Sequence, residues 1–138
     1  MKIVFRVDAS ITMGTGHVMR CRTLATVLKK QGADIQFITR AHPGHLGDML
    51  ARDGFTVILL PPPVDIENKV DDYAAWLGVS QQEDADQTIA ALAKQPCDWL
   101  IVDHYGLDRF WEELLKPLTH KLMVIDDLAN RPHECDVL

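Results

Sequence analysis

Long apolar runs are absent from this sequence. No stretch approaches the roughly 20 consecutive apolar residues that a membrane-spanning helix needs, so we expect no association with a membrane. The apolar stretch at the amino terminus is interrupted by Arg6 and Asp8, which argues against a secretory signal peptide.

Cysteine and positive charge are also scarce. The three cysteines, Cys21, Cys97 and Cys135, are odd in number and widely spaced, so they match neither a disulfide framework nor a zinc-binding pattern. We therefore expect reduced thiols in the core of a cytoplasmic protein. The formal net charge of −6 and the lack of a basic block argue against a general nucleic-acid binder.

Several common catalytic motifs are missing as well. The phosphate-binding pattern G-x-x-x-x-G-K-S/T does not occur, and neither does the G-x-S-x-G turn of serine hydrolases. The dinucleotide-binding pattern G-x-G-x-x-G is incomplete, because Arg20 lies in the region where the helix must approach a pyrophosphate. Gly14 and Gly16 by themselves are weak evidence for such a site.

The sequence does contain a regular alternation of strand and helix patterns. Its 138 residues, 47% hydrophobic and 25% charged, are typical of one soluble globular domain. The predicted strands cover residues 2–7, 33–39, 55–60, 97–102 and 121–125, with a further short strand over 135–138. Amphipathic spacing predicts helices that begin at His17, near Pro43, at Gln81 and at Leu107. This alternation predicts a Rossmann-like open α/β domain, with a parallel sheet covered by helices on both faces.

One connection, residues 64–80, is long for a compact domain, and such connections are often functional. It could hold a short helical turn around residues 73–77. Tyr73 and Trp76 would then be available to flank a ligand. The commoner alternative is that these aromatic side chains fold back onto the body of the domain.

The most informative stretch runs from Arg6 to Arg20, from the first strand through a glycine-containing loop into the first helix. Such a turn leaves unpaired N–H groups and a positive helix end at the carboxyl edge of the sheet. His17 stands at this helix start, which disfavours a charged imidazole. A neutral His17 that accepts a proton is one hypothesis, and a packing or capping role is an equal alternative.

Other polar residues should gather at the same edge, where open α/β sheets bind ligands. The expected site residues are Asp8, Gly14, Gly16, His17, Arg20, Asp103, His104 and Tyr105. Arg20 lies one turn beyond His17 and could orient it or meet an anionic substrate. A salt bridge from Arg20 to Asp8 or Asp103 is the structural alternative.

Further strand-end residues favour no specific site. We expect His42 and His45 to be solvated loop residues. Asp103 could in principle hold a divalent metal together with Asp126 and Asp127. Aspartates at strand ends more often cap helices or bind hydroxyl groups.

Three ordered blocks of the sequence resemble those of the pseudaminic acid biosynthesis hydrolases, which cleave UDP from UDP-2,4-diacetamido-2,4,6-trideoxy-β-L-altropyranose. The blocks are Arg6-Val-Asp-Ala-Ser with Gly14-Thr-Gly-His-Val-Met-Arg-Cys, Asp98-Trp-Leu-Ile-Val-Asp-His-Tyr-Gly-Leu-Asp, and Val124-Ile-Asp-Asp-Leu-Ala-Asn-Arg-Pro-His. The resemblance spans the whole chain.

The resemblance implies a two-domain glycosyltransferase-B architecture, in which the carboxyl-terminal domain binds UDP and the amino-terminal domain faces the sugar. It implies that His17 is the general base that activates a water molecule, with no metal or cofactor. From their loop positions we expect Asp8, Asp103, His104 and Tyr105 to contact the sugar. The family continues into a second domain, so we expect the UDP-binding half to be absent from this chain and the chain alone to hydrolyse its substrate poorly. A glycosyltransferase of the same fold and a non-catalytic nucleotide-sugar-binding module are the alternatives.

Overall fold

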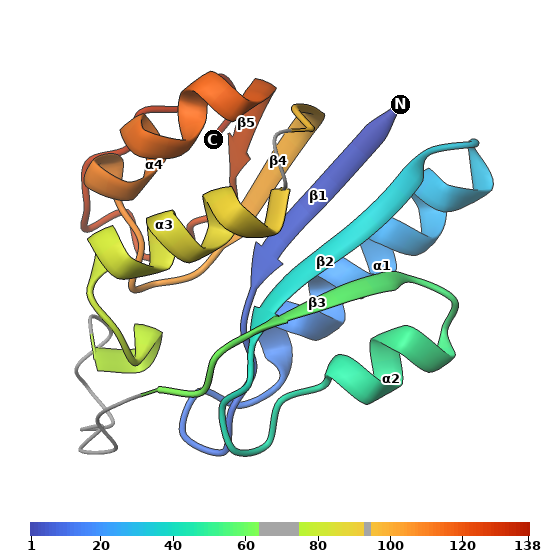
Figure 1. Ribbon diagram of the computed structural model, residues 1–138, viewed down its shortest axis with the longest axis horizontal. Helices are drawn as coiled ribbons and strands as arrows, with labels where there is room; N and C mark the ends of the chain where they lie inside the picture. Colours follow the sequence, from blue (N-terminus) through green and yellow to red (C-terminus); the bar gives the residue numbers. More distant parts are fainter. Residues whose placement is uncertain (64–74, 93–94) are drawn as a thin grey trace.

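Five parallel strands form one open sheet in the order β3-β2-β1-β4-β5 (Figure 1). This computed structural model describes residues 1–63, 75–92 and 95–138. The strands are β1 (Lys2–Val7), β2 (Asp34–Arg40), β3 (Thr56–Leu60), β4 (Cys97–Asp103) and β5 (Thr119–Val124). The predicted Rossmann-like α/β fold is confirmed, and each of these strands lies within two residues of its predicted ends.

Helices cover both faces of the sheet (Figure 1). They are α1 (Gly16–Lys30), α2 (Gly47–Arg52), α3 (Gln81–Leu92) and α4 (Arg109–Leu115), with short 3₁₀ helices over Ala75–Leu77 and Lys116–Leu118. On one face Phe5 and Val7 of β1 pack in a buried cluster with Val18 of α1 and Leu50 of α2. None of the helices in the described ranges is long and apolar enough to cross a membrane.

The opposite face of the sheet is covered by α3 and α4. Val4 of β1 lies there in a second buried cluster with Leu92 of α3 and Trp111 of α4. A central parallel strand that is buried on both faces needs apolar side chains in both directions, which explains the apolar residues Ile3, Val4, Phe5 and Val7 of β1. The same burial makes the charged side chain of Arg6, in this strand, unusual.

The prediction of a further strand over 135–138 is wrong. Only a single parallel bridge, between Met123 and Val137, is formed there. The carboxylate of Asp136 accepts a hydrogen bond from the backbone N–H of Leu122, at 2.8 Å. A side chain thus takes a donor that the ladder of a regular strand would use.

The three thiols are free. Cys21 and Cys97 are buried, as predicted, whereas Cys135 is only partly buried. Of the two aromatic residues singled out in the long connection, Tyr73 lies outside the described residues and Trp76 is buried in the 3₁₀ helix over Ala75–Leu77.

Candidate functional site

The polar loops at the carboxyl ends of the strands meet at one edge of the sheet, as predicted. His104, after β4, contacts Asp8, after β1, with 2.9 Å between Nε2 and Oδ2. Arg20 reaches Asp127, after β5, with 3.5 Å between the charged atoms. Segments far apart in the sequence therefore build one continuous polar region.

The loop between β1 and α1 shapes the start of the helix. Gly14 has a φ of +79°, in the left-handed region that favours glycine, and its N–H donates to the Ser10 carbonyl at 2.8 Å. Thr15 is the N-cap of α1 but makes no side-chain capping hydrogen bond, and the first turn contains no acidic residue. A Cβ added at Gly16 would meet nothing within 4 Å, so open space lies above the helix start.

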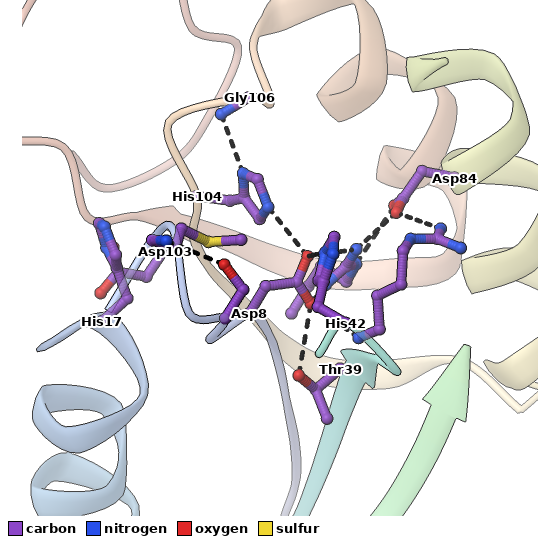
Figure 2. Close-up of polar contacts among 12 residues, drawn as sticks. Asp8, His17, Thr39, His42, Asp84, Asp103, His104 and Gly106 are labelled. Atoms are coloured by element: carbon purple, nitrogen blue, oxygen red, sulfur yellow. Dashed lines mark hydrogen bonds and ion pairs between the residues drawn. The ribbon is translucent and has the colours of Figure 1, made fainter. Parts of the chain in front are cut away.

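His17 projects from this first turn and is 8% exposed. Its Nδ1 lies 2.7 Å from Oδ1 of Asp103, at the end of β4 (Figure 2). Arg20 makes a bidentate ion pair with the same carboxylate, through Nε at 2.5 Å and Nη2 at 2.7 Å. The salt bridge between Arg20 and Asp103, one of the two expected for Arg20, is thus present.

The charge of Asp103 is stabilised despite its complete burial. Burial alone would raise the pKa of this carboxyl, but hydrogen bonds from Arg20 and His17 outweigh that effect and leave the pKa below its usual value. The hydrogen bonds to Asp103 likewise raise the pKa of Arg20. Asp103 is therefore a carboxylate and a hydrogen-bond acceptor.

Two further residues complete the arrangement around His17. The hydroxyl of Tyr105 donates to Asp127 at 2.5 Å, and the Tyr105 ring meets the His17 ring edge to face, with centroids 4.5 Å apart. Burial and the hydrogen bond to Asp127 raise the pKa of Tyr105 to about 12, so the phenol stays neutral at ordinary pH. We call His17, Arg20, Asp103, Tyr105 and Asp127 the His17 cluster.

A pocket of about 260 Å³ opens beside this cluster. Its lining residues are Met13, Gly16, His17, Arg20, Trp76 and Tyr105. Trp76 stacks on Tyr105 with ring centroids 6.0 Å apart, so it both folds back onto the domain and lines the pocket. Sites that enclose a whole small-molecule ligand have volumes of roughly 300–1,000 Å³. The smaller volume of this pocket is consistent with a site that binds one part of a ligand.

Asp8, another expected site residue, lies beneath this surface and is fully buried. Its carboxylate accepts hydrogen bonds from the backbone N–H of Arg40 at 2.7 Å and from Arg6 Nη1 at 2.6 Å, with His104 and Thr39 also in contact (Figure 2). The charge of Arg6 and the hydrogen bonds from His104 and His42 outweigh burial and hold the pKa of Asp8 well below its usual range.

His104 is buried as well, and burial lowers its pKa although the contact with Asp8 opposes this. Its Nδ1 accepts the N–H of Gly106 at 2.9 Å, so Nε2 is the nitrogen that donates to Asp8. Direct contact of Asp8 or His104 with a ligand stays a prediction.

The expectation that His42 is solvated is wrong. Its side chain is 1% exposed, and its Nε2 lies 3.4 Å from Oδ2 of Asp8. A buried carboxylate needs donors on its remaining lone pairs, and the loop after β2 folds inward to supply one. His45 is partly exposed and accepts the N–H of Gly47 at 3.1 Å.

Sequence reasoning missed Asp84, which lies in α3 and is fully buried. It receives hydrogen bonds from Arg6 at 2.5 Å, from Arg40 at 2.7 Å and from the indole of Trp111 at 2.9 Å. One available signal is its spacing of four residues from Thr88, which the helix pattern places on the buried side. A carboxylate on that side needs a cation, and Arg6 stands in an otherwise apolar strand.

The three aspartates considered as metal ligands each contact protein side chains. Asp103 pairs with Arg20, Asp127 accepts from Tyr105, and Asp126 lies 2.7 Å from Nε2 of His133. Across the described ranges, no group of three or more His, Cys, Asp or Glu side chains is arranged to hold a metal ion.

Comparisons with known proteins identify a relative of this chain. No protein-family model matches the chain. The chain is 30% identical, over 139 aligned positions, to the UDP-2,4-diacetamido-2,4,6-trideoxy-β-L-altropyranose hydrolase of Campylobacter jejuni subsp. jejuni serotype O:2. The alignment covers all of this chain but 40% of the relative. It supports a nucleotide-sugar-related function at the level of the family.

Proposed function

We propose that residues 1–138 are the sugar-facing, amino-terminal half of a UDP-sugar hydrolase, with His17 as its general base. The observation that carries the proposal is the position of His17. Its Nδ1 is occupied by Asp103, while His17 is among the residues that line the pocket and its Nε2 has no hydrogen-bond partner among the described residues. The hydrolase name of the Campylobacter relative supports the reaction class.

The proposed reaction needs only water as co-reactant. The water oxygen forms a bond to the anomeric carbon, and the bond from that carbon to the UDP oxygen breaks with its electron pair leaving on UDP. The proton of the attacking water passes to Nε2 of His17. UDP is a stable leaving group, so positioning the water and accepting its proton are the main tasks of the protein.

A two-domain architecture is part of the proposal. The pocket beside His17 has a volume of about 260 Å³, which suits a sugar ring better than a complete nucleotide sugar. The chain also spans 40% of the length of its Campylobacter relative. We propose that a carboxyl-terminal domain binds the UDP, that Gly14, Gly16, Arg20 and Tyr105 contact the sugar side of the substrate, and that the reaction takes place in the cytoplasm without a cofactor.

A glycosyltransferase of the same fold would use the same base on a sugar or lipid hydroxyl. A lipid acceptor would be supported by exposed apolar side chains over residues 40–50, at the same edge of the sheet. The large apolar side chains of that segment are buried or partly buried, with Leu50 fully buried. This segment therefore does not favour a lipid acceptor, and the preference for hydrolysis rests on the name of the Campylobacter relative.

The test is UDP release from the UDP-linked diacetamido sugar, in a version of the protein that continues into the proposed UDP-binding domain. His17→Asn should lower kcat by about 10²–10⁴-fold with substrate binding retained, because removal of a general base typically costs that much. His120→Asn, the same substitution at an exposed position near the start of β5, is the matched control and should leave the rate unchanged. Equal rates in the wild type and His17→Asn would refute the role of His17.

A further inference from the structure

We propose that Asp103 is a positioning residue that determines which ring nitrogen of His17 carries the proton. The inference rests on the proposed function, because its consequence is that Nε2 is left able to accept a proton at the pocket. Asp103 itself is fully buried and does not line the pocket. We therefore propose that Asp103 acts on the reaction through His17, in place of the sugar contact expected from its loop position.

The chemistry of the two groups determines which of them donates. An ionised carboxylate can only accept hydrogen bonds, whereas a neutral imidazole has one donor and one acceptor nitrogen. Because Nδ1 of His17 lies 2.7 Å from Oδ1 of Asp103, Nδ1 must be the nitrogen that carries hydrogen. Nε2 then has a lone pair, as a general base requires.

Arg20 fixes the direction of this hydrogen bond. Its Nη2 lies 3.3 Å from Nδ1 of His17, but a guanidinium has no acceptor, so it cannot receive the Nδ1 proton. Both groups instead donate to the carboxylate of Asp103, which Arg20 binds through two nitrogens. Cys21 adds a fourth donor, with its Sγ 3.6 Å from Oδ2. Four donors directed at two oxygens leave Asp103 as a pure acceptor.

The backbone holds the pair in place. Asp103 ends β4 and is in register with Val7 of the central strand, while His17 is in the first turn of α1, a helix of 15 residues. The carboxylate therefore belongs to the sheet and the imidazole to the helix. The packing of α1 against the sheet therefore keeps the imidazole of His17 and the carboxylate of Asp103 in contact, and this contact determines the tautomer of His17.

The substitution Asp103→Asn should reverse the tautomer. The introduced amide has one oxygen that accepts and one nitrogen that donates. Arg20 donates at both carboxylate positions, so the amide nitrogen must take one of them, and we expect it at the position of Oδ1, where the neighbouring imidazole of His17 can change from donor to acceptor. The amide nitrogen would then face Nδ1 of His17 and donate to it. Nδ1 becomes the acceptor, the proton moves to Nε2, and the nitrogen at the pocket loses its lone pair.

Nitrogen-15 NMR of the 138-residue chain with labelled histidines tests the tautomer of His17 without substrate or turnover. At a pH where the imidazole is neutral, the wild type should show His17 protonated at Nδ1, and Asp103→Asn should show it mainly protonated at Nε2. His17→Asn identifies the signals by their loss. Asp127→Asn, an isosteric change at another carboxylate of the His17 cluster, is the control and should keep the wild-type tautomer.

The wild-type spectrum alone can overturn the proposal, even if Asp103→Asn fails to fold. A His17 protonated at Nε2 in the wild type would contradict it, as would an unchanged tautomer in folded Asp103→Asn. In the longer protein, Asp103→Asn should lower kcat by about 10²–10⁴-fold, no more than the loss of the base itself, with little change in KM. The expected tautomers without any UDP release would refute the proposed hydrolysis and leave the role of Asp103 intact.

Discussion

Tyr105 and His17 meet edge to face, with their ring centroids 4.5 Å apart and their planes at 87°. The same tyrosine stacks on Trp76 and donates its hydroxyl to Asp127. One side chain thus links the aromatic wall of the pocket to the imidazole and to the polar edge of the sheet. Its ring and its hydroxyl have separable roles.

Tyr105→Phe keeps the ring and loses the hydroxyl. We expect it to weaken substrate binding by less than about tenfold, since a typical hydrogen bond contributes about 0.5–1.5 kcal/mol. Tyr105→Ala also removes both ring contacts and should weaken binding by more than tenfold. Isothermal titration with the UDP-sugar measures both variants in the longer protein when each also carries His17→Asn, which we expect to keep substrate binding without turnover. An affinity in Tyr105→Ala equal to that of His17→Asn alone would exclude the aromatic wall from the binding site.

Gly14 and Gly16 should respond differently to the same substitution. Gly14→Ala places a Cβ on a residue with a φ of +79°, which costs about 1–2 kcal/mol of folding free energy. Gly16→Ala meets no atom within 4 Å and should not lower stability, but its methyl group would occupy the rim of the pocket and weaken ligand binding. Urea unfolding and ligand titration of both variants separate these effects. Destabilisation by Gly16→Ala with unchanged binding would contradict the assignment.

Asp84 should be essential for stability. Arg6, Arg40 and Asp84 are all fully buried, and removal of the carboxylate leaves two guanidinium groups without this partner. We expect Asp84→Asn to cost about 3–5 kcal/mol of unfolding free energy, as for other broken buried ion pairs. Asp53→Asn, at the exposed pair with Arg22, is the control and should have little effect. Chemical denaturation measures both, and equal effects would be evidence against the buried network.

The same network predicts loss of stability in acid. The pKa values of Asp8 and Asp84 are lowered in the folded state, because nearby Arg6 outweighs the effect of burial. A lowered carboxyl pKa contributes stability that is present above the unfolded value of 3.8 and is lost as the pH falls through the lower folded value. Thermal unfolding should therefore show a steep fall in Tm below about pH 4. A Tm that stays flat from pH 5 to pH 2 would contradict this account.

The contacts of His133 predict that its contribution to stability falls as the pH rises, the opposite direction. Its Nδ1 and Nε2 each lie 2.7 Å from a buried carboxylate, those of Glu112 and Asp126. Burial alone would lower the pKa of His133, but the two carboxylates outweigh it and raise the pKa above 6.5. The stability from this contact is present below pH 6.5 and is lost as the pH rises through the higher folded value.

His133→Gln should therefore be more destabilising at pH 6 than at a pH well above the raised value. Urea midpoints at a series of pH values measure the difference, with His120→Asn as the exposed control. An effect of His133→Gln that is the same at every pH would show that the imidazole is not charged in the folded protein.

The fold could be predicted from the sequence because its signals are local. Each strand contains adjacent apolar residues, and Gly32, Gly54 and Pro96 separate the elements. Two details differ from the prediction. The helix expected to begin near Pro43 begins at Gly47. No strand forms over residues 135–138, because the Asp136 side chain takes a hydrogen-bond donor from β5, which no strand pattern encodes.

The position of the candidate site could also be predicted, but the hydrogen bonds and ion pairs among its residues could be predicted only in part. His17, Arg20 and Asp103 stand at a helix start and a strand end, and the parallel topology alone brings them to one edge. Asp84 was missed because its partner Arg6 lies 78 residues away, on a strand that the helix pattern of α3 does not specify. The burial of His42 could not be predicted, because its position in a loop does not show that the side chain contacts a buried acceptor, Asp8.

The most direct test of the central claim, attack of water at the anomeric carbon beside His17, is hydrolysis of the UDP-sugar in ¹⁸O-labelled water by the longer protein. Mass spectrometry of the released UDP reports which bond is cleaved. The account predicts UDP without ¹⁸O, because the water oxygen goes to the sugar. Incorporation of ¹⁸O into the phosphate of UDP would contradict it, because water would then attack phosphorus.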